Sequence, residues 1–199
     1  LCNKANLLNQ SAFYLGVPGA GKSFAVKELI AFLMLHPDYA DDDILICDPE
    51  GEFGALVKTL GREKATVAHL VAGGKDRLNA MYMVEGYGEN NPIVEKSQFV
   101  MSLIEQYPEA EKAGRAATLC DLRRKLLEQP EDKAKEIALS LELYTTGSLD
   151  IFGRESTVDL SKPYVVFDIH GLGEQLKPAG SLVITDTILN RVTLNWKRG

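Results

Sequence analysis

A glycine-rich stretch near the start of the chain has the residue types and the spacing of a phosphate-binding loop. Gly16, Gly21, Lys22 and Ser23 match the pattern G-x-x-x-x-G-K-[ST], and Gly19 adds a further glycine inside it. Glycines let the backbone wrap closely enough for several N–H groups to point at one anion. Lys22 would reach the β- and γ-phosphates of a nucleotide, and the Ser23 hydroxyl would hold Mg²⁺.

The flanking residues predict the elements that such a loop needs. The apolar, partly aromatic run 12–16 predicts a buried strand before the loop. After the loop, apolar residues recur at helical spacing until Pro37 and Asp38 end the helix, whose N-terminal dipole would attract phosphate. This order favours a nucleotide site over a glycine-rich turn without a ligand. The candidate binding residues are Gly16, Val17, Pro18, Gly19, Ala20, Gly21, Lys22, Ser23 and Phe24.

A group of acidic residues follows a second predicted strand, at 44–47. Asp48 stands at the carboxyl end of that strand, and Glu50 and Glu52 follow in the turn. In a parallel α/β sheet this edge faces the ligand crevice, where carboxylates can order Mg²⁺ or a water molecule. Two interpretations stay open. Asp48 is a metal ligand beside catalytic glutamates, or Asp48 and Gly51 hold a turn and the glutamates cap the next helix.

A further candidate metal ligand, Asp168, ends the apolar run "VVFD", which has the form of a Walker B strand. A hydrolytic site usually has a second acid after that aspartate, but Ile169 follows here, which makes Asp168 the weaker candidate. Two histidines lie near predicted strand ends. His69, inside a third predicted strand at 65–71, is interpreted as a packed or edge residue, and His170 as a loop residue.

The rest of the chain predicts an α/β fold with an added helical region. A helix beginning at 91–92 and two amphipathic segments, 109–130 and 131–147, have helical spacing and solvated charged faces. Short strands at 156–160 and 163–168 and a helix from about 179 to 196 follow. We therefore expect a mostly parallel sheet in three parts: 1–91 as the first half of the core, 92–147 as a helical insert, and 148–199 as the return to the core.

Composition excludes several classes of protein. The net charge of −6 argues against a standing nucleic-acid-binding surface. The three cysteines lie far apart with no CxxC spacing, which predicts neither a disulfide framework nor a zinc site and favours a reducing, cytosolic setting. No apolar stretch approaches the roughly 20 residues that a membrane span needs. The absence of an initiator methionine suggests a fragment of a longer protein.

Six segments together resemble the ATPase domain of conjugative-transfer proteins. These are the TraE/TraC-type ATPases, the fourth VirB component of type IV secretion systems, within the FtsK/HerA group of RecA-like P-loop motors. The D-P-x-G-E pattern at 48–52 discriminates best, because many families share the P-loop. In chain order, the segments are "GVPGAGKSFAVKELI", "DDDILICDPEGEFGALVKTLG", "NPIVEKSQFVMSLIE", "ALSLELYTTGSLDIF", "VVFDIHGLGEQLK" and "LNRVT".

This resemblance implies a RecA-like core that binds ATP and Mg²⁺ and hydrolyses ATP. The motor would form a hexamer at the cytoplasmic face of the inner membrane and power assembly of the channel that moves DNA and protein between cells. Its partners would be other secretion components, with DNA handled indirectly. Carried over by motif, the residues that would bind the triphosphate and Mg²⁺ are Gly16, Gly19, Gly21, Lys22 and Ser23, with Lys22 neutralising developing charge. Asp48, Glu50 and Glu52 would form the acidic turn beside them.

The chain departs from the family pattern at two places. The family's own Walker B strand, ending in Asp-Glu, lies beyond the segment matching "NRVTLNWKRG". By that alignment Asp168 belongs to an earlier strand, the catalytic glutamate lies beyond residue 199, and the fold is incomplete at its C-terminus. Near 106–107 the family has a longer helical stretch, so a deletion or an absent segment is expected there. We expect this chain to bind nucleotide better than it hydrolyses it.

Two other functions stay open. A P-loop kinase would transfer the γ-phosphoryl group to a small acceptor, but it needs a lid with clustered arginines, and the arginines here are scattered. A nucleotide-gated assembly module without catalysis would bind nucleotide and not turn it over.

Overall fold

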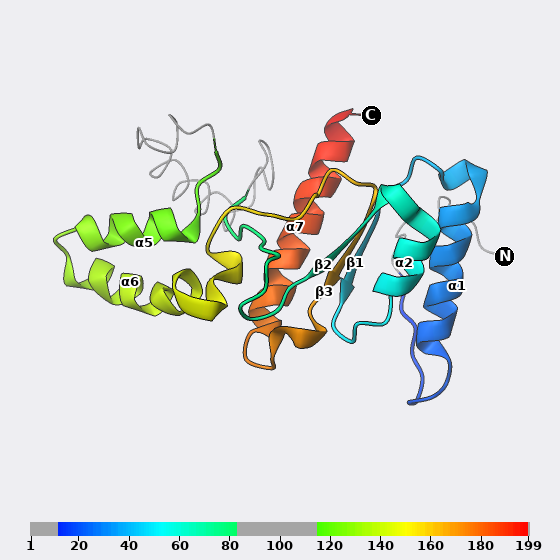
Figure 1. Ribbon diagram of the computed structural model, residues 1–199, viewed down its shortest axis with the longest axis horizontal. Helices are drawn as coiled ribbons and strands as arrows, with labels where there is room; N and C mark the ends of the chain where they lie inside the picture. Colours follow the sequence, from blue (N-terminus) through cyan, green and yellow to red (C-terminus); the bar gives the residue numbers. More distant parts are fainter. Residues whose placement is uncertain (1–11, 83–114, 199) are drawn as a thin grey trace. The chain divides into compact units, whose positions relative to one another are not determined.

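The computed structural model describes residues 12–82 and 115–198 of the chain (Figure 1). The chain divides into two compact units, Leu1–Asp41 and Asp42–Gly199, and each is described by itself. The predicted helix that begins at 91–92 and the expected irregularity at 106–107 lie outside the described residues.

The first unit contains the helix that was expected after the glycine loop. Helix α1 spans Lys22–Leu35 and is followed by the 3₁₀ turn η2, Pro37–Tyr39. His36 has extended backbone, as a residue before proline prefers, and this ends α1 where the sequence predicted. The His36 ring lies 5.0 Å from the Phe32 ring and 5.5 Å from the Tyr39 ring, so an aromatic cluster closes the turn.

The buried strand predicted at 12–16 is wrong. These residues have no strand structure, and the side chains of Phe13 and Leu15 are 87% and 91% exposed. An extended segment becomes a strand only when a neighbour takes up its backbone N–H and C=O groups. In the described residues, no strand pairs with this segment.

The second unit is built on a parallel sheet, which confirms the predicted α/β class. Its strands are β1 (Ile44–Asp48), β2 (Ala65–His69) and β3 (Tyr164–Asp168), in the order β1-β3-β2. In the central strand, residues 164–167 are all buried. The apolar run "YVVF" fits this position, because a central parallel strand is covered on both faces.

Helices cover both faces of this sheet (Figure 1). On one face, Val165 and Phe167 pack in a buried cluster with Ile184 of α7 (Lys177–Arg198). On the other face lies α2 (Gly54–Gly61), which packs on β2 and β3. A Cβ atom at Gly54 would lie 3.2 Å from Val67 Cγ1, so the glycine lets α2 approach the sheet closely. The period-2 alternation of β3 therefore places successive side chains against different helices.

The two amphipathic segments in the middle of the chain, predicted at 109–130 and 131–147, are helical over most of their described residues, and the two helices form a hairpin. Helices α5 (Leu119–Glu128) and α6 (Asp132–Thr145) pack against each other, and the 3₁₀ segment η4 (Gly147–Phe152) follows. Arg123 joins the two helices, because its Nε donates to Ala138 O at 3.1 Å and its guanidinium lies 3.3 Å from the Glu142 carboxylate. Two other short 3₁₀ turns, η3 (Arg62–Lys64) and η5 (His170–Leu172), complete the described elements.

The strand predicted at 156–160 is also wrong. This segment runs beside the loop after β2, but side-chain hydroxyls supply part of the bonding. Thr157 Oγ1 accepts from Arg77 N at 2.9 Å, and Ser156 Oγ accepts from Asn79 N at 2.9 Å. Backbone N–H groups that would enter a strand ladder bond to Ser and Thr side chains instead, so no regular strand forms.

The start of α5 carries a pH-dependent contribution to stability. Asp121 is buried, and hydrogen bonds from the Arg115 guanidinium, with further bonds from Thr118, lower the pKa of its carboxyl group to about 2. Because the folded pKa lies below the ordinary value near 3.8, the stabilisation is complete above about pH 4. It is lost as the pH falls through about 2.

We predict that Asp121→Asn removes about 2 kcal/mol of unfolding free energy at pH 7 and much less at pH 2. Urea unfolding followed by circular dichroism at both pH values measures this difference. An equal loss at both pH values would contradict an electrostatic origin and indicate a packing defect.

Candidate functional site

The glycine loop in the first unit has backbone conformations that only glycine adopts without strain. Gly19 and Gly21 have φ angles of 80° and 81°, in the left-handed region. Ala20 N donates a hydrogen bond to Val17 O at 3.2 Å, which closes a turn within the loop. The local geometry therefore requires glycine at Gly21 of the motif and at the additional Gly19.

Lys22 folds back over this loop. Its Nζ donates to Gly16 O at 2.9 Å and to Val17 O at 3.0 Å, although Lys22 lies six positions after Gly16. The ammonium group is thus fixed at the loop and not extended into solvent. A cation held there, beside inward-pointing backbone N–H groups, is what a phosphate-binding loop needs.

The start of α1 leaves its backbone N–H groups available to an external anion. Gly21 is the N-cap residue, no side chain caps the helix, and its first turn contains no acidic residue. The first N–H groups of a helix have no partner within the helix, and the helix dipole adds positive potential there. Ser23 and Phe24 lie exposed on this first turn, so the nine candidate binding residues form one continuous, largely exposed stretch.

In the second unit, three polar residues end the three strands in register. Asp168 of the central strand is paired with Asp48 of β1 on one side and with His69 of β2 on the other. The carboxyl edge of a parallel sheet is the place where α/β proteins bind ligands. The strands therefore bring together, at this edge, residues that lie far apart in the sequence.

Asp48 holds the turn that follows β1. Its carboxylate is fully buried, and it accepts hydrogen bonds from Glu52 N at 3.1 Å and from Phe53 N at 2.8 Å. Gly51 has φ 69°, and Glu50 and Glu52 are exposed at the surface of the turn. These contacts support the turn interpretation of Asp48. The roles of Asp48 in metal binding and of Glu50 and Glu52 in catalysis stay predictions.

Asp168 forms a side-chain pair that sequence reasoning missed. Its Oδ2 lies 3.0 Å from His69 Nδ1, and its Oδ1 accepts from His170 N at 3.0 Å. The His69 side chain is 65% exposed and lies at the end of an edge strand, which agrees with the interpretation of His69 as an edge residue. The available signal in the sequence was that Asp168 ends one apolar run and that His69 stands as a polar residue within another.

Comparison with known proteins gives a structural match. No protein-family model matches the sequence, and no curated protein matches it. The structure of VirB4 from Thermoanaerobacter pseudethanolicus is similar to this chain, with a TM-score of 0.60 and 19% sequence identity. The match covers 89% of this chain and 55% of the VirB4 chain.

The fold is similar to that of VirB4. At 19% identity the likeness establishes the fold alone, and it agrees with the family that the six sequence segments resemble. The chain spans about half the length of the VirB4 chain that it matches.

The described residues contain neither a group of side chains arranged to hold a metal ion nor a membrane-spanning helix. No group of three His, Cys, Asp or Glu side chains in 12–82 or 115–198 is arranged to hold a metal ion. This is compatible with Mg²⁺, which is usually held by one or two protein ligands together with substrate phosphates. Within the same residues, no helix has the length and apolar character to cross a membrane.

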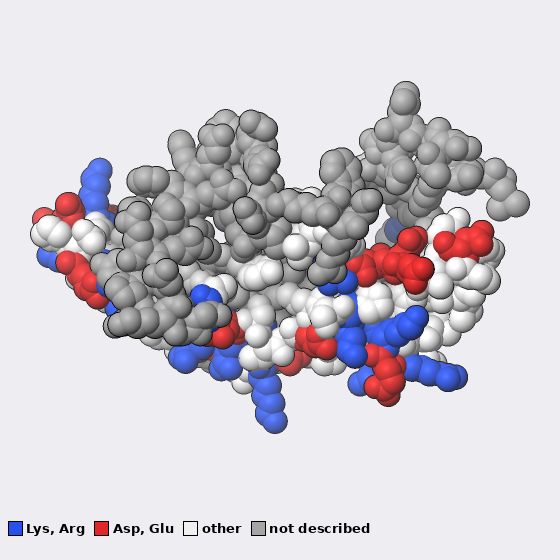
Figure 2. Space-filling model, turned by 90° about the horizontal axis from the view of Figure 1, so that it is seen from above, with Lys and Arg blue, Asp and Glu red and all other residues white. Residues whose placement is uncertain are grey.

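The charged side chains and the cysteines of the described residues were also candidates for a nucleic-acid-binding surface or a reactive thiol. On the face shown in Figure 2, basic and acidic side chains are intermixed among the described residues. Cys47 and Cys120 are free thiols, and burial raises the pKa of both, which disfavours the reactive thiolate form.

Proposed function

We propose that the chain is the nucleotide-binding part of an ATPase that energises type IV secretion or conjugative transfer. The observation that carries this proposal is the geometry of the loop, with its two left-handed glycines and the Lys22 ammonium held at Gly16 and Val17. The similarity to VirB4 supports the same conclusion at the level of the fold.

In this proposal the loop binds the triphosphate of ATP through residues 16–24. Lys22 would leave its carbonyl partners for the β- and γ-phosphates and neutralise the charge that develops on them. The Ser23 hydroxyl would hold Mg²⁺; Asp48, the other candidate ligand, already accepts bonds from Glu52 N and Phe53 N. Glu50 and Glu52, exposed in the turn after β1, are proposed to order the attacking water. Bound Mg²⁺ would supply charge neutralisation between the phosphates.

The wider setting is proposed from the resemblance and from the VirB4 match. The complete motor would act as a hexamer at the cytoplasmic face of the inner membrane. Its partners would be other secretion components, and DNA would be handled through them.

Isothermal titration calorimetry with Mg-ATP, together with a phosphate-release assay, tests the proposal on this chain. We expect saturable binding of one nucleotide with little phosphate release. The absence of binding would contradict the proposal. Phosphate appearing on a small acceptor instead of in water would favour a P-loop kinase, and binding that leaves ATP intact even in a longer chain would favour an assembly module.

A further inference from the structure

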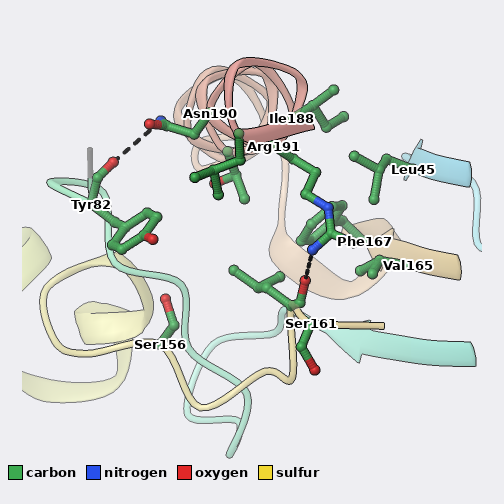
Figure 3. A pocket seen from close by; sticks show the side chains of 12 residues that line it. Leu45, Tyr82, Ser156, Ser161, Val165, Phe167, Ile188, Asn190 and Arg191 are labelled. Carbon is green, nitrogen blue, oxygen red and sulfur yellow. Dashed lines mark hydrogen bonds between the residues drawn. The ribbon is translucent and has the colours of Figure 1, made fainter. Parts of the chain in front are cut away.

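A cavity of about 270 Å³ in the second unit is separate from both candidate sites (Figure 3). It lies between the C-terminal half of α7, the α7-facing side of the sheet, and the loop that precedes β3. It shares no residue with the loop 16–24, with the acidic turn 48–52 or with the Asp168–His69 pair.

The inner wall of the cavity is apolar. The sheet contributes Leu45, Val165 and Phe167, and α7 contributes Ile188 and Leu194. Leu45 and Val165 are register partners on neighbouring strands, so they form a continuous surface. An apolar wall of this kind favours an apolar ligand, because such a ligand gives up few hydrogen bonds to water when it enters the cavity.

The one charged side chain among the described lining residues is already neutralised. The Arg191 guanidinium donates to both carboxylate oxygens of Asp43, at 2.6 and 3.0 Å, and to Leu160 O at 2.8 Å. Both side chains of this pair are largely buried, with 17% and 15% exposure. A bidentate pair of this kind has little attraction left for a free anion, because a competing carboxylate would have to displace Asp43.

Polar groups at the rim of the cavity can orient a ligand by hydrogen bonding, and the ligand need not be charged. Tyr82 lies on the wall opposite the sheet, and its carbonyl accepts from Asn190 Nδ2 at 3.3 Å. Figure 3 shows the Tyr82 ring at the edge of the cavity with Ser156 on the same side, whereas Ser161 lies nearer the sheet. Aromatic side chains on two walls, Tyr82 and Phe167, provide faces and edges for a flat ring.

We propose that this cavity binds a neutral, mainly apolar molecule with an aromatic ring system. A cavity of about 150 Å³ lined by apolar side chains holds benzene, so the larger volume here suits a fused two-ring compound. One hydroxyl or amide group of the rim would form a hydrogen bond with the ligand. It would accept from an indole N–H, or it would donate to or accept from a ring hydroxyl. This site does not depend on nucleotide binding.

The test is binding of indole to the ¹⁵N-labelled chain, followed by amide chemical shifts. We expect shifts confined to the cavity-lining residues and a dissociation constant of about 1 mM or below. Indole-3-acetate, which adds a carboxylate, should bind about tenfold more weakly, since Arg191 is already paired with Asp43.

Two threonines of α7 give a matched pair of variants. Thr187 lines the cavity and Thr185 is exposed, and each hydroxyl donates to the backbone carbonyl four residues earlier, at 2.8 Å. Thr187→Phe should fill the cavity and weaken indole binding at least about tenfold, whereas Thr185→Phe should leave it unchanged. If Thr187→Phe does not fold, Leu160→Trp fills the cavity from the opposite wall.

Three results would overturn the proposal. They are the absence of any indole-induced shifts, shifts spread over the surface without saturation, and unchanged affinity in a folded cavity-filling variant.

Discussion

Lys22→Ala is expected to weaken Mg-ATP binding by about 100-fold or more, which places it beyond detection by calorimetry. Gly16 O and Val17 O keep the ammonium group close to the loop, and on nucleotide binding it would exchange these two bonds for bonds to the phosphates. Charge-assisted bonds to two phosphates contribute roughly 1.5–3 kcal/mol each. Truncation at Cβ removes both bonds and the positive charge together.

A matched control separates this local effect from a general change of charge. Lys58 is exposed on α2 in the second unit, so Lys58→Ala removes the same charge from a helix without touching the loop. We expect Lys58→Ala to bind Mg-ATP like the unaltered chain. Equal affinity in the Lys22→Ala variant and the unaltered chain would remove the basis for the nucleotide site.

The parts of the fold that sequence reasoning predicted correctly are those in which local pattern and tertiary context agree. The run "YVVF" is apolar throughout, and the structure places it in the centre of a parallel sheet with helices on both faces. Helix α1 begins at the glycine loop and ends before Pro37. At that point the helix propensity falls and the helical spacing of apolar residues stops. In these segments the local sequence favours the same secondary structure that the fold requires.

The two strand errors have a common physical cause. Periodicity reports whether a segment can be extended, but a strand also needs a backbone partner, which periodicity does not report. At 156–157 the neighbouring loop is present, yet Ser156 and Thr157 bond to it through their hydroxyls. At 12–16 no described strand lies alongside to pair with the extended segment.

The candidate functional residues also include some that the sequence indicates and others that only the structure reveals. The glycine loop could be proposed from the sequence because its chemistry lies within eight consecutive residues. The structure adds the left-handed conformations of Gly19 and Gly21, and nucleotide binding at the loop stays a prediction. The Asp168–His69 pair joins residues 99 positions apart, so only the strand order could reveal it. For Asp48 both interpretations used the same sequence, and only the hydrogen bonds of its carboxylate could favour one of them.

Asp48→Ala is expected to destabilise the second unit by about 2–4 kcal/mol. The carboxylate is fully buried and accepts two backbone hydrogen bonds, from Glu52 and Phe53. Its removal leaves two N–H groups without an acceptor, and each unsatisfied buried group costs roughly 1–3 kcal/mol. Urea unfolding followed by circular dichroism measures the change, with Glu50→Gln in the same exposed turn as the control, expected within about 0.5 kcal/mol of the unaltered chain.

Magnesium decides between the two roles of Asp48, because a turn-holding carboxylate and a metal ligand respond to it differently. If Asp48 acts by holding the turn, the loss of stability in Asp48→Ala is the same with and without Mg²⁺, and the Mg²⁺ dependence of ATP binding is unchanged. A stability loss below about 1 kcal/mol, combined with loss of the Mg²⁺ dependence, would instead assign Asp48 to the metal. The two bonds to Glu52 N and Phe53 N lead us to expect the first result, and Ser23 would then be the loop's own ligand to the ion.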